Sequence, residues 1–347
     1  MNRKKFLTTA SAAALLAAMP YKSMSAEDRK KRIKTIKPPR LRAGDTLGLI
    51  SPGSFISEKE LEESKDNLTK LGFKVVTAKN VLARHGYLGG TDIQRADDVN
   101  EMFANMDVKG IVCTRGGYGC ARILSLLDYD LIKHNPKVLI GYSDITSLLY
   151  GLYSQTGLVC FHGPVGTSTF NDFSVKNFTD VLINPVKPLT LTNALPEKDT
   201  EYFKPKIIKG GMAEGILTGG NLSIVVSLVG TPYDIDTDGK ILFLEEVGEE
   251  PYRVDRMLTQ MKQAGKFNKV KGIVLGVFTR ADSKPESFSD SLSLFDVLSD
   301  RLCNLGVPVV YGMSFGHIVN KFTLPICVHC SLNADEKTIT LKENAVL

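Results

Sequence analysis

The chain has 347 residues, of which 43% are hydrophobic and 23% are charged, as in ordinary globular proteins. This length is enough for two domains with a sizeable core. The formal charge of +5 arises at the N-terminus: the first 35 residues hold nine Lys and Arg against two acids, so the remainder carries a net charge of −2. That balance leaves no basic patch and argues against nucleic acid as a partner.

Residues 1–26 have the pattern of a secretory signal peptide. Arg3-Lys4-Lys5 precedes a short apolar run at residues 10–19, and small residues follow it. The run is too short to span a bilayer, so we expect no stable membrane insertion. The pattern predicts an exported, periplasmic protein, or a cytoplasmic one if the N-terminus is not processed. Residues 2–7 also resemble a twin-arginine signal in which Lys replaces the second Arg, and a basic leader continues to about residue 36.

Strands and helices alternate through the first half of the chain. In chain order, the patterns predict a strand at 46–52, a helix from the Ser57 capping box to about 71, a strand at 73–77, a helix at 92–104, a strand at 110–114, a helix at 118–128, a strand from 138, a helix after 143 and a strand at 159–161. This alternation is typical of a parallel, doubly wound sheet. We therefore predict an N-terminal α/β domain over residues 27–185.

The pattern changes after this domain. Residues 186–205 are polar, contain prolines and show little periodicity, which predicts a linker. Beyond it, short strands punctuated by glycine alternate with two helices, at 253–264 and 294–305. We predict a smaller, C-terminal α+β domain over residues 206–347.

Ser143 occupies the most informative position in the chain. An apolar run, Val138 to Ile140, stops at Gly141, and a helix-forming run starts at Ile145. Ser143 therefore lies on a sharp strand-to-helix turn, which exposes its hydroxyl as in a nucleophile elbow. In open α/β sheets, chemistry gathers beyond the carboxyl ends of the strands, where this turn lies.

A second glycine-rich turn, Arg115-Gly116-Gly117-Tyr118-Gly119, is expected at the same edge of the sheet. Its spacing fits neither the dinucleotide-binding fingerprint nor the P-loop. It can instead supply a backbone N–H to an oxyanion hole, together with the N–H of Asp144. A tight turn in which the glycines only relieve backbone strain explains the pattern equally well.

A serine nucleophile needs a base, and histidine is the usual one. His162 ends a strand at the same edge, and His317 follows a short strand of the second domain; spacing does not choose between them. The orienting acid is expected where the strand at 240–244 ends, at Glu245-Glu246. Cys327, His329 and Cys330 look like half of a metal site, but no second pair completes four ligands, so we predict no metal site.

Five motifs in this order resemble the LD-carboxypeptidase family of serine peptidases, from about residue 37 to near the C-terminus. They are Arg115-Gly116-Gly117-Tyr118-Gly119, Gly141-Tyr142-Ser143-Asp144, Gly219-Gly220-Asn221-Leu222, Leu244-Glu245 with Tyr252-Arg253-Val254-Asp255-Arg256, and Phe315-Gly316-His317. The resemblance implies a flavodoxin-like N-terminal domain that carries the nucleophile and a C-terminal domain that carries the acid and base. It also implies a homodimer and no cofactor.

The resemblance further implies a triad of Ser143, Glu245 and His317, with an oxyanion hole formed by the N–H groups of Gly117 and Asp144. It points to Arg115, Tyr118, Asn221 and Arg253 as substrate-binding candidates. The substrate it implies is a murein tetrapeptide, from which the terminal D-Ala is released by hydrolysis of an L,D-peptide bond.

Two other functions fit the same residues. The first is a related peptidase or amidase that gives self-immunity to a peptide–nucleotide antibiotic. The second belongs to a different class, an exported two-domain protein that binds a small molecule without catalysis. A reactive Ser143 separates either enzyme from the binding protein.

Overall fold

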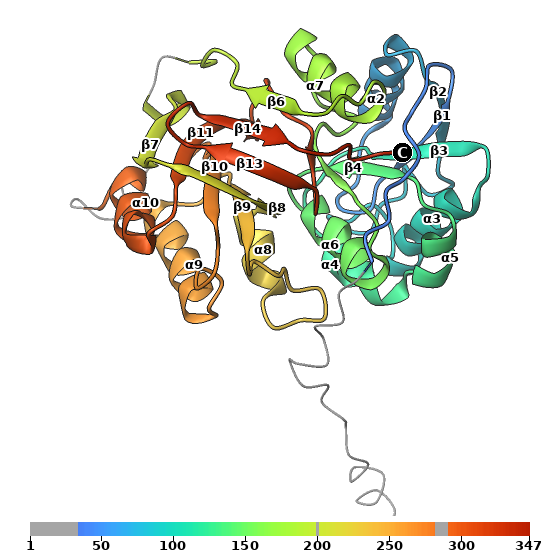
Figure 1. The fold of residues 1–347 in the computed structure, drawn as a ribbon. Coiled ribbons are helices and arrows are strands. Elements are labelled where there is room, and N and C mark those ends of the chain that lie inside the picture. Colours follow the sequence, from blue (N-terminus) through green and yellow to red (C-terminus); the bar gives the residue numbers. More distant parts are fainter. Residues whose placement is uncertain (1–33, 199–200, 282–290) are drawn as a thin grey trace, which may run out of the picture. The chain divides into compact units, whose positions relative to one another are not determined.

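The computed structural model describes residues 34–198, 201–281 and 291–347, and contacts group residues 35–347 into one compact unit. The predicted signal peptide lies outside the described residues. Two sheets form the framework of this unit (Figure 1). Each sheet carries part of the residues that the sequence singled out.

The first sheet has the strand order β12-β5-β4-β3-β1-β2. Its five N-terminal strands pair in parallel, and their order 2-1-3-4-5 is that of flavodoxin-like doubly wound folds. This confirms the predicted α/β class. The strands are β1 (Thr46–Ile50), β2 (Lys74–Thr77), β3 (Val108–Cys113), β4 (Val138–Gly141), β5 (Phe161–His162) and β12 (Leu324–Pro325).

Helices cover both faces of the first sheet. In Figure 1, α2 and α7 lie on one side, and α3, α4, α5 and α6 lie on the other. Capping boxes begin two of them, at Ser57 for α2 and at Thr91 for α3, where the side chains satisfy the first free backbone N–H groups. The helices are α2 (Glu58–Lys70), α3 (Asp92–Ala104), α4 (Cys120–Ile123), α5 (Tyr129–His134), α6 (Ile145–Thr156) and α7 (Asp172–Leu182).

The helix predicted at 118–128 is the clearest difference from the sequence interpretation. Only α4 is α-helical there, and the 3-10 helix η2 (Leu124–Leu126) follows it. Gly119 has φ +125°, so no helix runs through it, and the helical turns begin at Cys120. Leu124 is 1% exposed and packs against Gly151 of α6. The α-helix therefore covers only four residues, and the buried Leu124 lies at the start of the 3-10 helix that follows it.

The second sheet is mixed and has the order β6-β14-β13-β8-β9-β10-β11-β7. Its central strands β8, β9, β10 and β11 are parallel, and the outer strands pair antiparallel. The strands are β6 (Leu189–Thr192), β7 (Lys206–Lys209), β8 (Met212–Asn221), β9 (Lys240–Glu245), β10 (Gly272–Val277), β11 (Val309–Gly316), β13 (His329–Asn333) and β14 (Thr338–Leu341). The helices are α8 (Leu222–Leu228), α9 (Pro251–Gln263) and α10 (Leu294–Leu302), with η4 (Cys303–Leu305).

The chain passes between the two sheets more than once. Residues 186–205, predicted as a linker, contain β6 and the 3-10 helix η3 (Glu201–Phe203), and β6 is an edge strand of the second sheet. Later, β12 returns to the first sheet and pairs with β5. Ile326 then donates to the Cys160 carbonyl at 2.8 Å and Cys327 to the Leu217 carbonyl at 2.8 Å, so neighbouring residues join both sheets.

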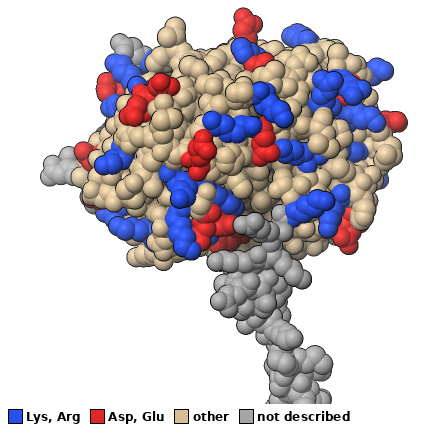
Figure 2. Space-filling view, viewed as in Figure 1, with Lys and Arg blue, Asp and Glu red and all other residues tan. Residues whose placement is uncertain are grey.

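Charged side chains of both signs are interspersed over the face seen in Figure 2. Among the described residues, no helix is long and apolar enough to cross a membrane.

Candidate active site

Ser143 lies in the turn between β4 and α6, as the sequence predicted. Its φ is +65°, a left-handed conformation that is strained for any residue other than glycine and is typical of functional turns. Thr146 N–H donates to the Ser143 carbonyl at 2.9 Å and closes the turn. A Cβ built on Gly116 would lie 2.9 Å from Ser143 Cβ and 3.2 Å from Ser143 Oγ. The glycine-rich loop therefore touches the serine, and only glycine fits there.

The structure brings Ser143, His317 and Glu245 into one hydrogen-bonded row. His317 Nε2 lies 3.1 Å from Ser143 Oγ, and His317 Nδ1 lies 2.8 Å from Glu245 Oε2. Ser143 comes from the first sheet, whereas Glu245 ends β9 and His317 follows β11 in the second sheet. Gly316 has φ +109°, and a Cβ there would lie 3.1 Å from Glu245 Oε2. Glycine thus lets β11 end directly against the acid.

Glu245 is fully buried. Burial by itself would raise the pKa of its carboxyl, but the positive charge and the hydrogen bond of His317, together with the nearby His162 at 3.7 Å, outweigh burial and lower the pKa to about 2. The carboxylate is therefore ionised and faces His317. An anion in this position holds the imidazole with its proton on Nδ1 and leaves Nε2 free to accept.

Glu246 has a different role from its neighbour. Its carboxylate accepts from Ser223 N at 2.7 Å and Ser223 Oγ at 2.5 Å, and from Asn221 Nδ2 at 3.3 Å. Burial and the nearby charge of Glu245 raise its pKa. Adjacent strand residues point to opposite faces, so Glu246 anchors the start of α8 while Glu245 faces His317.

The two N–H groups predicted for an oxyanion hole have no acceptor among the described residues. Within the described residues, neither Gly117 N–H nor Asp144 N–H forms a hydrogen bond, whereas Tyr118 N–H, which follows Gly117, donates to Ser54 Oγ at 3.2 Å. Gly117 adopts φ +99°. The Asp144 carboxylate accepts from Cys120 N at 2.9 Å and so ties the glycine-rich loop to the serine turn. Neither N–H is therefore used by a hydrogen bond within the described fold.

Three of the four substrate-binding candidates are accessible. Arg115 has a side chain 42% exposed, with Nη1 3.5 Å from Glu60. Tyr118 is 52% exposed, and its ring lies 5.7 Å from that of Tyr87. Arg253 has a side chain 44% exposed and is the one of the three in the second domain.

Asn221, the fourth candidate, is buried, and its polar groups already have partners within the protein. Its side-chain oxygen accepts from Ile224 N at 3.2 Å and caps α8, and its amide donates to Glu246. Its backbone N–H donates to Thr146 Oγ1 at 3.2 Å. Asn221 therefore joins the second sheet to the helix that follows Ser143.

A further polar contact that holds this helix was not predicted from the sequence. Tyr150 of α6 is buried, and its hydroxyl lies 2.8 Å from Thr218 Oγ1 and accepts from Gly219 N at 2.5 Å. Gly220 packs directly on Thr146, where a Cβ would lie 2.5 Å from the threonine methyl group. The glycine pair in Gly219-Gly220-Asn221 was the available signal, since it allows this close approach between β8 and α6.

The Cys327–Cys330 region is structural in the fold. Cys327 and Cys330 are buried and are free thiols, and His329 lies on β13. Within residues 34–198, 201–281 and 291–347, no cluster of three or more His, Cys, Asp or Glu is arranged to hold a metal ion.

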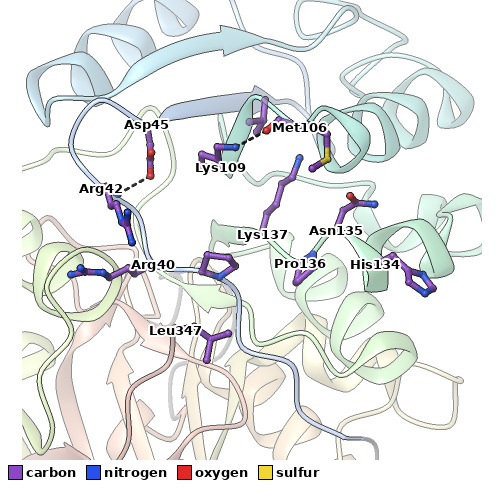
Figure 3. A pocket seen from close by; sticks show the side chains of 12 residues that line it. Arg40, Arg42, Asp45, Met106, Lys109, His134, Asn135, Pro136, Lys137 and Leu347 are labelled. Carbon is purple, nitrogen blue, oxygen red and sulfur yellow. Dashed lines mark hydrogen bonds between the residues drawn. The ribbon is translucent and has the colours of Figure 1, made fainter.

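A pocket of about 400 Å³ lies away from this row, where β1, β3 and β4 begin (Figure 3). Its lining includes Arg42, Lys109 and Lys137 but no member of the row. Lys137 Nζ donates to the Met102 carbonyl at 2.9 Å, and Lys109 Nζ donates to the Met106 carbonyl at 2.6 Å. These lysines neutralise the carboxyl end of α3 and the turn after it. Their contacts give them a structural role.

The fold and the site together define a two-domain α/β protein with the polar row of a serine hydrolase across its two sheets. Residues 47–163 match the model of the LD-carboxypeptidase N-terminal domain, and residues 214–332 match that of the LD-carboxypeptidase C-terminal domain. The chain therefore belongs to the LD-carboxypeptidase family of serine peptidases, and the predicted resemblance is confirmed.

Individual relatives cover nearly the whole described unit. A protein of Bacillus subtilis named "Probable murein peptide carboxypeptidase" is 39% identical over 88% of this chain and 94% of its own length. The microcin C7 self-immunity protein MccF of Escherichia coli is 31% identical over 87% of this chain and 94% of its own length. The crystal structure of muramoyltetrapeptide carboxypeptidase from Oxalobacter formigenes aligns with a TM-score of 0.74 and 29% identity, covering 86% of this chain and 99% of that one.

Proposed function

We propose that this chain is a serine carboxypeptidase that hydrolyses the L,D-peptide bond of murein tetrapeptides and releases the terminal D-Ala. The observation that carries the proposal is the row Ser143–His317–Glu245, with distances of 3.1 and 2.8 Å. Names of relatives supply the substrate class, since two of the matched proteins are named for murein peptides.

In the proposed first step, His317 Nε2 takes the proton of Ser143 Oγ as the oxygen attacks the carbonyl carbon of the scissile bond. The free N–H groups of Gly117 and Asp144 hold the oxyanion, and each such donor typically contributes about 10²–10³ in rate. His317 then passes its proton to the leaving amine, and D-Ala departs. Glu245 keeps the imidazole oriented and stabilises its positive charge throughout.

An acyl-enzyme remains, with the rest of the peptide esterified to Ser143. His317 takes a proton from water, and the resulting hydroxide adds to the ester carbonyl. The collapse of this second intermediate returns the proton to Ser143 Oγ and frees the shortened peptide. No cofactor is required by this sequence of steps.

A carboxypeptidase must recognise the free terminal carboxylate of its substrate. Arg115 and Arg253 are proposed for this contact because both side chains are accessible and guanidinium binds carboxylate through two parallel hydrogen bonds. Tyr118 is proposed to contact the peptide beside them, since its ring is exposed next to the glycine-rich loop. Export, a periplasmic location and homodimerisation stay predictions.

Ser143→Ala tests the mechanism directly. The variant should fold and should release no D-Ala from a defined tetrapeptide, while the wild type converts the tetrapeptide and leaves the tripeptide control intact, as followed by mass spectrometry. Unchanged D-Ala release by Ser143→Ala would contradict the serine mechanism.

The similarity to MccF favours one second candidate, cleavage of an amide in a peptide–nucleotide antibiotic. The same assay separates the two functions when the tetrapeptide and such a conjugate are compared at equal concentration. A higher kcat/KM for the tetrapeptide supports murein turnover, and a higher value for the conjugate supports self-immunity.

A further inference from the structure

His162 is the second histidine near the acid, and it lies in an aromatic enclosure. It ends β5 of the first sheet and is 1% exposed. The centroids of the Tyr142, Phe243 and Phe315 rings lie 6.1, 5.3 and 6.3 Å from that of its imidazole, all edge-on. Tyr142 belongs to the first domain and the two phenylalanines to the second, so the ring is held from both sides.

The polar atoms in this enclosure have few partners. Among the described residues, neither ring nitrogen of His162 forms a hydrogen bond, and neither does Glu245 Oε1. His162 Nε2 lies 3.7 Å from that oxygen, which is longer than a hydrogen bond but close enough for a direct charge–dipole contact. Leaving a buried carboxylate oxygen without a donor is costly. The N–H of His162 is placed to meet that need.

Protonation states follow from the chemistry of the partner. An ionised carboxylate only accepts hydrogen bonds, so an imidazole that stabilises it must carry a proton on the nitrogen that faces it. For His162 that nitrogen is Nε2, and for His317 it is Nδ1. Glu245 would then receive one N–H on each oxygen.

The sheets that carry these residues indicate a role for His162 beyond packing. Ser143 belongs to the first sheet, while Glu245 and His317 belong to the second. His162 is a group of the first sheet that contacts the acid itself. A donor in this position fixes the carboxylate relative to the sheet that carries the nucleophile.

We propose that His162 is a positioning residue, whose Nε2–H holds Glu245 Oε1 so that Oε2 stays aimed at His317. The proposal rests on the proposed peptidase function, since it assigns His162 a part in that site. His162 is not the base: its Nε2 faces Glu245, whereas Ser143 Oγ meets His317.

Two substitutions separate the N–H donor from the volume of the ring. His162→Phe fits an enclosure already lined by aromatic rings and has no donor, while His162→Gln can place an N–H close to the position of Nε2. By analogy with groups that orient metal ligands, we expect kcat for D-Ala release to fall about 10–100-fold in His162→Phe with KM little changed. His162→Gln should stay within a few-fold of the wild type. Full activity of His162→Phe, or equal loss in both variants, would overturn the proposal.

The tautomer of His162 gives a test that needs neither turnover nor a variant. In the ¹⁵N NMR spectrum of the histidine-labelled wild type, with His162→Gln used only for assignment, we expect the neutral ring to carry its proton on Nε2. A proton on Nδ1 would overturn the proposal even if D-Ala is released. Absence of D-Ala release with the Nε2–H tautomer present would instead contradict the proposed function and leave the contact with Glu245 supported.

Discussion

Glu245→Gln tests the proposed row at its buried end. The substitution keeps the shape of the side chain and removes its charge. If the new amide NH₂ faces His317 Nδ1, the imidazole must accept there and carry its proton on Nε2, where it no longer takes the proton of Ser143. If the amide oxygen faces Nδ1, the tautomer is kept but the positive charge that forms on His317 loses its counter-ion.

The size of the second effect follows from the distance. Unit charges 2.8 Å apart attract by about 6 kcal/mol at an effective dielectric constant of about 20. The amide dipole recovers part of this, and each 1.36 kcal/mol corresponds to about tenfold in rate. We therefore expect kcat to fall by about 10³–10⁴ in Glu245→Gln, similar to the loss when the acid of a serine protease triad is made an amide.

D-Ala release at saturating tetrapeptide measures this kcat, and thermal unfolding shows that the variant is folded. Glu246→Gln is the matched control, because the neighbouring carboxylate contacts Ser223 and Asn221 rather than His317. The control should keep kcat within a few-fold of the wild type. Activity of Glu245→Gln within about tenfold of the wild type, or an equal loss in the control, would refute the assigned role of Glu245.

Two further predictions concern acid stability and the serine turn. The folded-state pKa of Glu245 is about 2, below its ordinary value of 4.5. The ionised carboxylate therefore contributes about 3 kcal/mol to the free energy of unfolding above about pH 4.5, and this contribution is lost as the pH falls toward 2. Urea unfolding should therefore show a steeper loss of stability between about pH 4.5 and about pH 2 for the wild type than for Glu245→Gln; equal slopes would contradict this. Gly116→Ala should lower kcat about 10–100-fold, because its Cβ would lie 2.9 Å from Ser143 Cβ and displace the nucleophile. Wild-type kinetics in a folded Gly116→Ala variant would contradict this, since they would show that the turn accommodates the methyl group without displacing Ser143.

Local patterns predicted the parts of the fold that local physics controls. Alternating strands and helices identified the doubly wound sheet, and a strand that stops at Gly141 before a helix identified the turn at Ser143. Both signals lie within a few residues of the feature they predict. The helix predicted at 118–128 is shorter in the structure, since Gly119 has φ +125° and the α-helix ends at Ile123. Leu124, which follows it, contacts Gly151 of α6, and a local pattern does not encode such a contact between distant segments.

Local patterns also could not choose between His162 and His317 as the base, because the choice depends on contacts between distant segments. Both histidines contact Glu245, one on each carboxylate oxygen, since the ends of β5 and β11 converge on the end of β9. No spacing in the chain encodes which of them also reaches Ser143. The resemblance to a family favoured His317, and the 3.1 Å contact with Ser143 Oγ is consistent with that choice.

The polar contacts between the two sheets also explain how a fully buried carboxylate can serve a site made from distant segments. Tyr150 joins α6 to β8 through buried hydrogen bonds, and residues 326–327 join both sheets through the backbone. Glu245 is consequently desolvated when the chain folds, not when substrate binds. The desolvation of the acid is therefore offset within the folded protein, where the histidines lower its pKa, and the row meets each substrate already oriented.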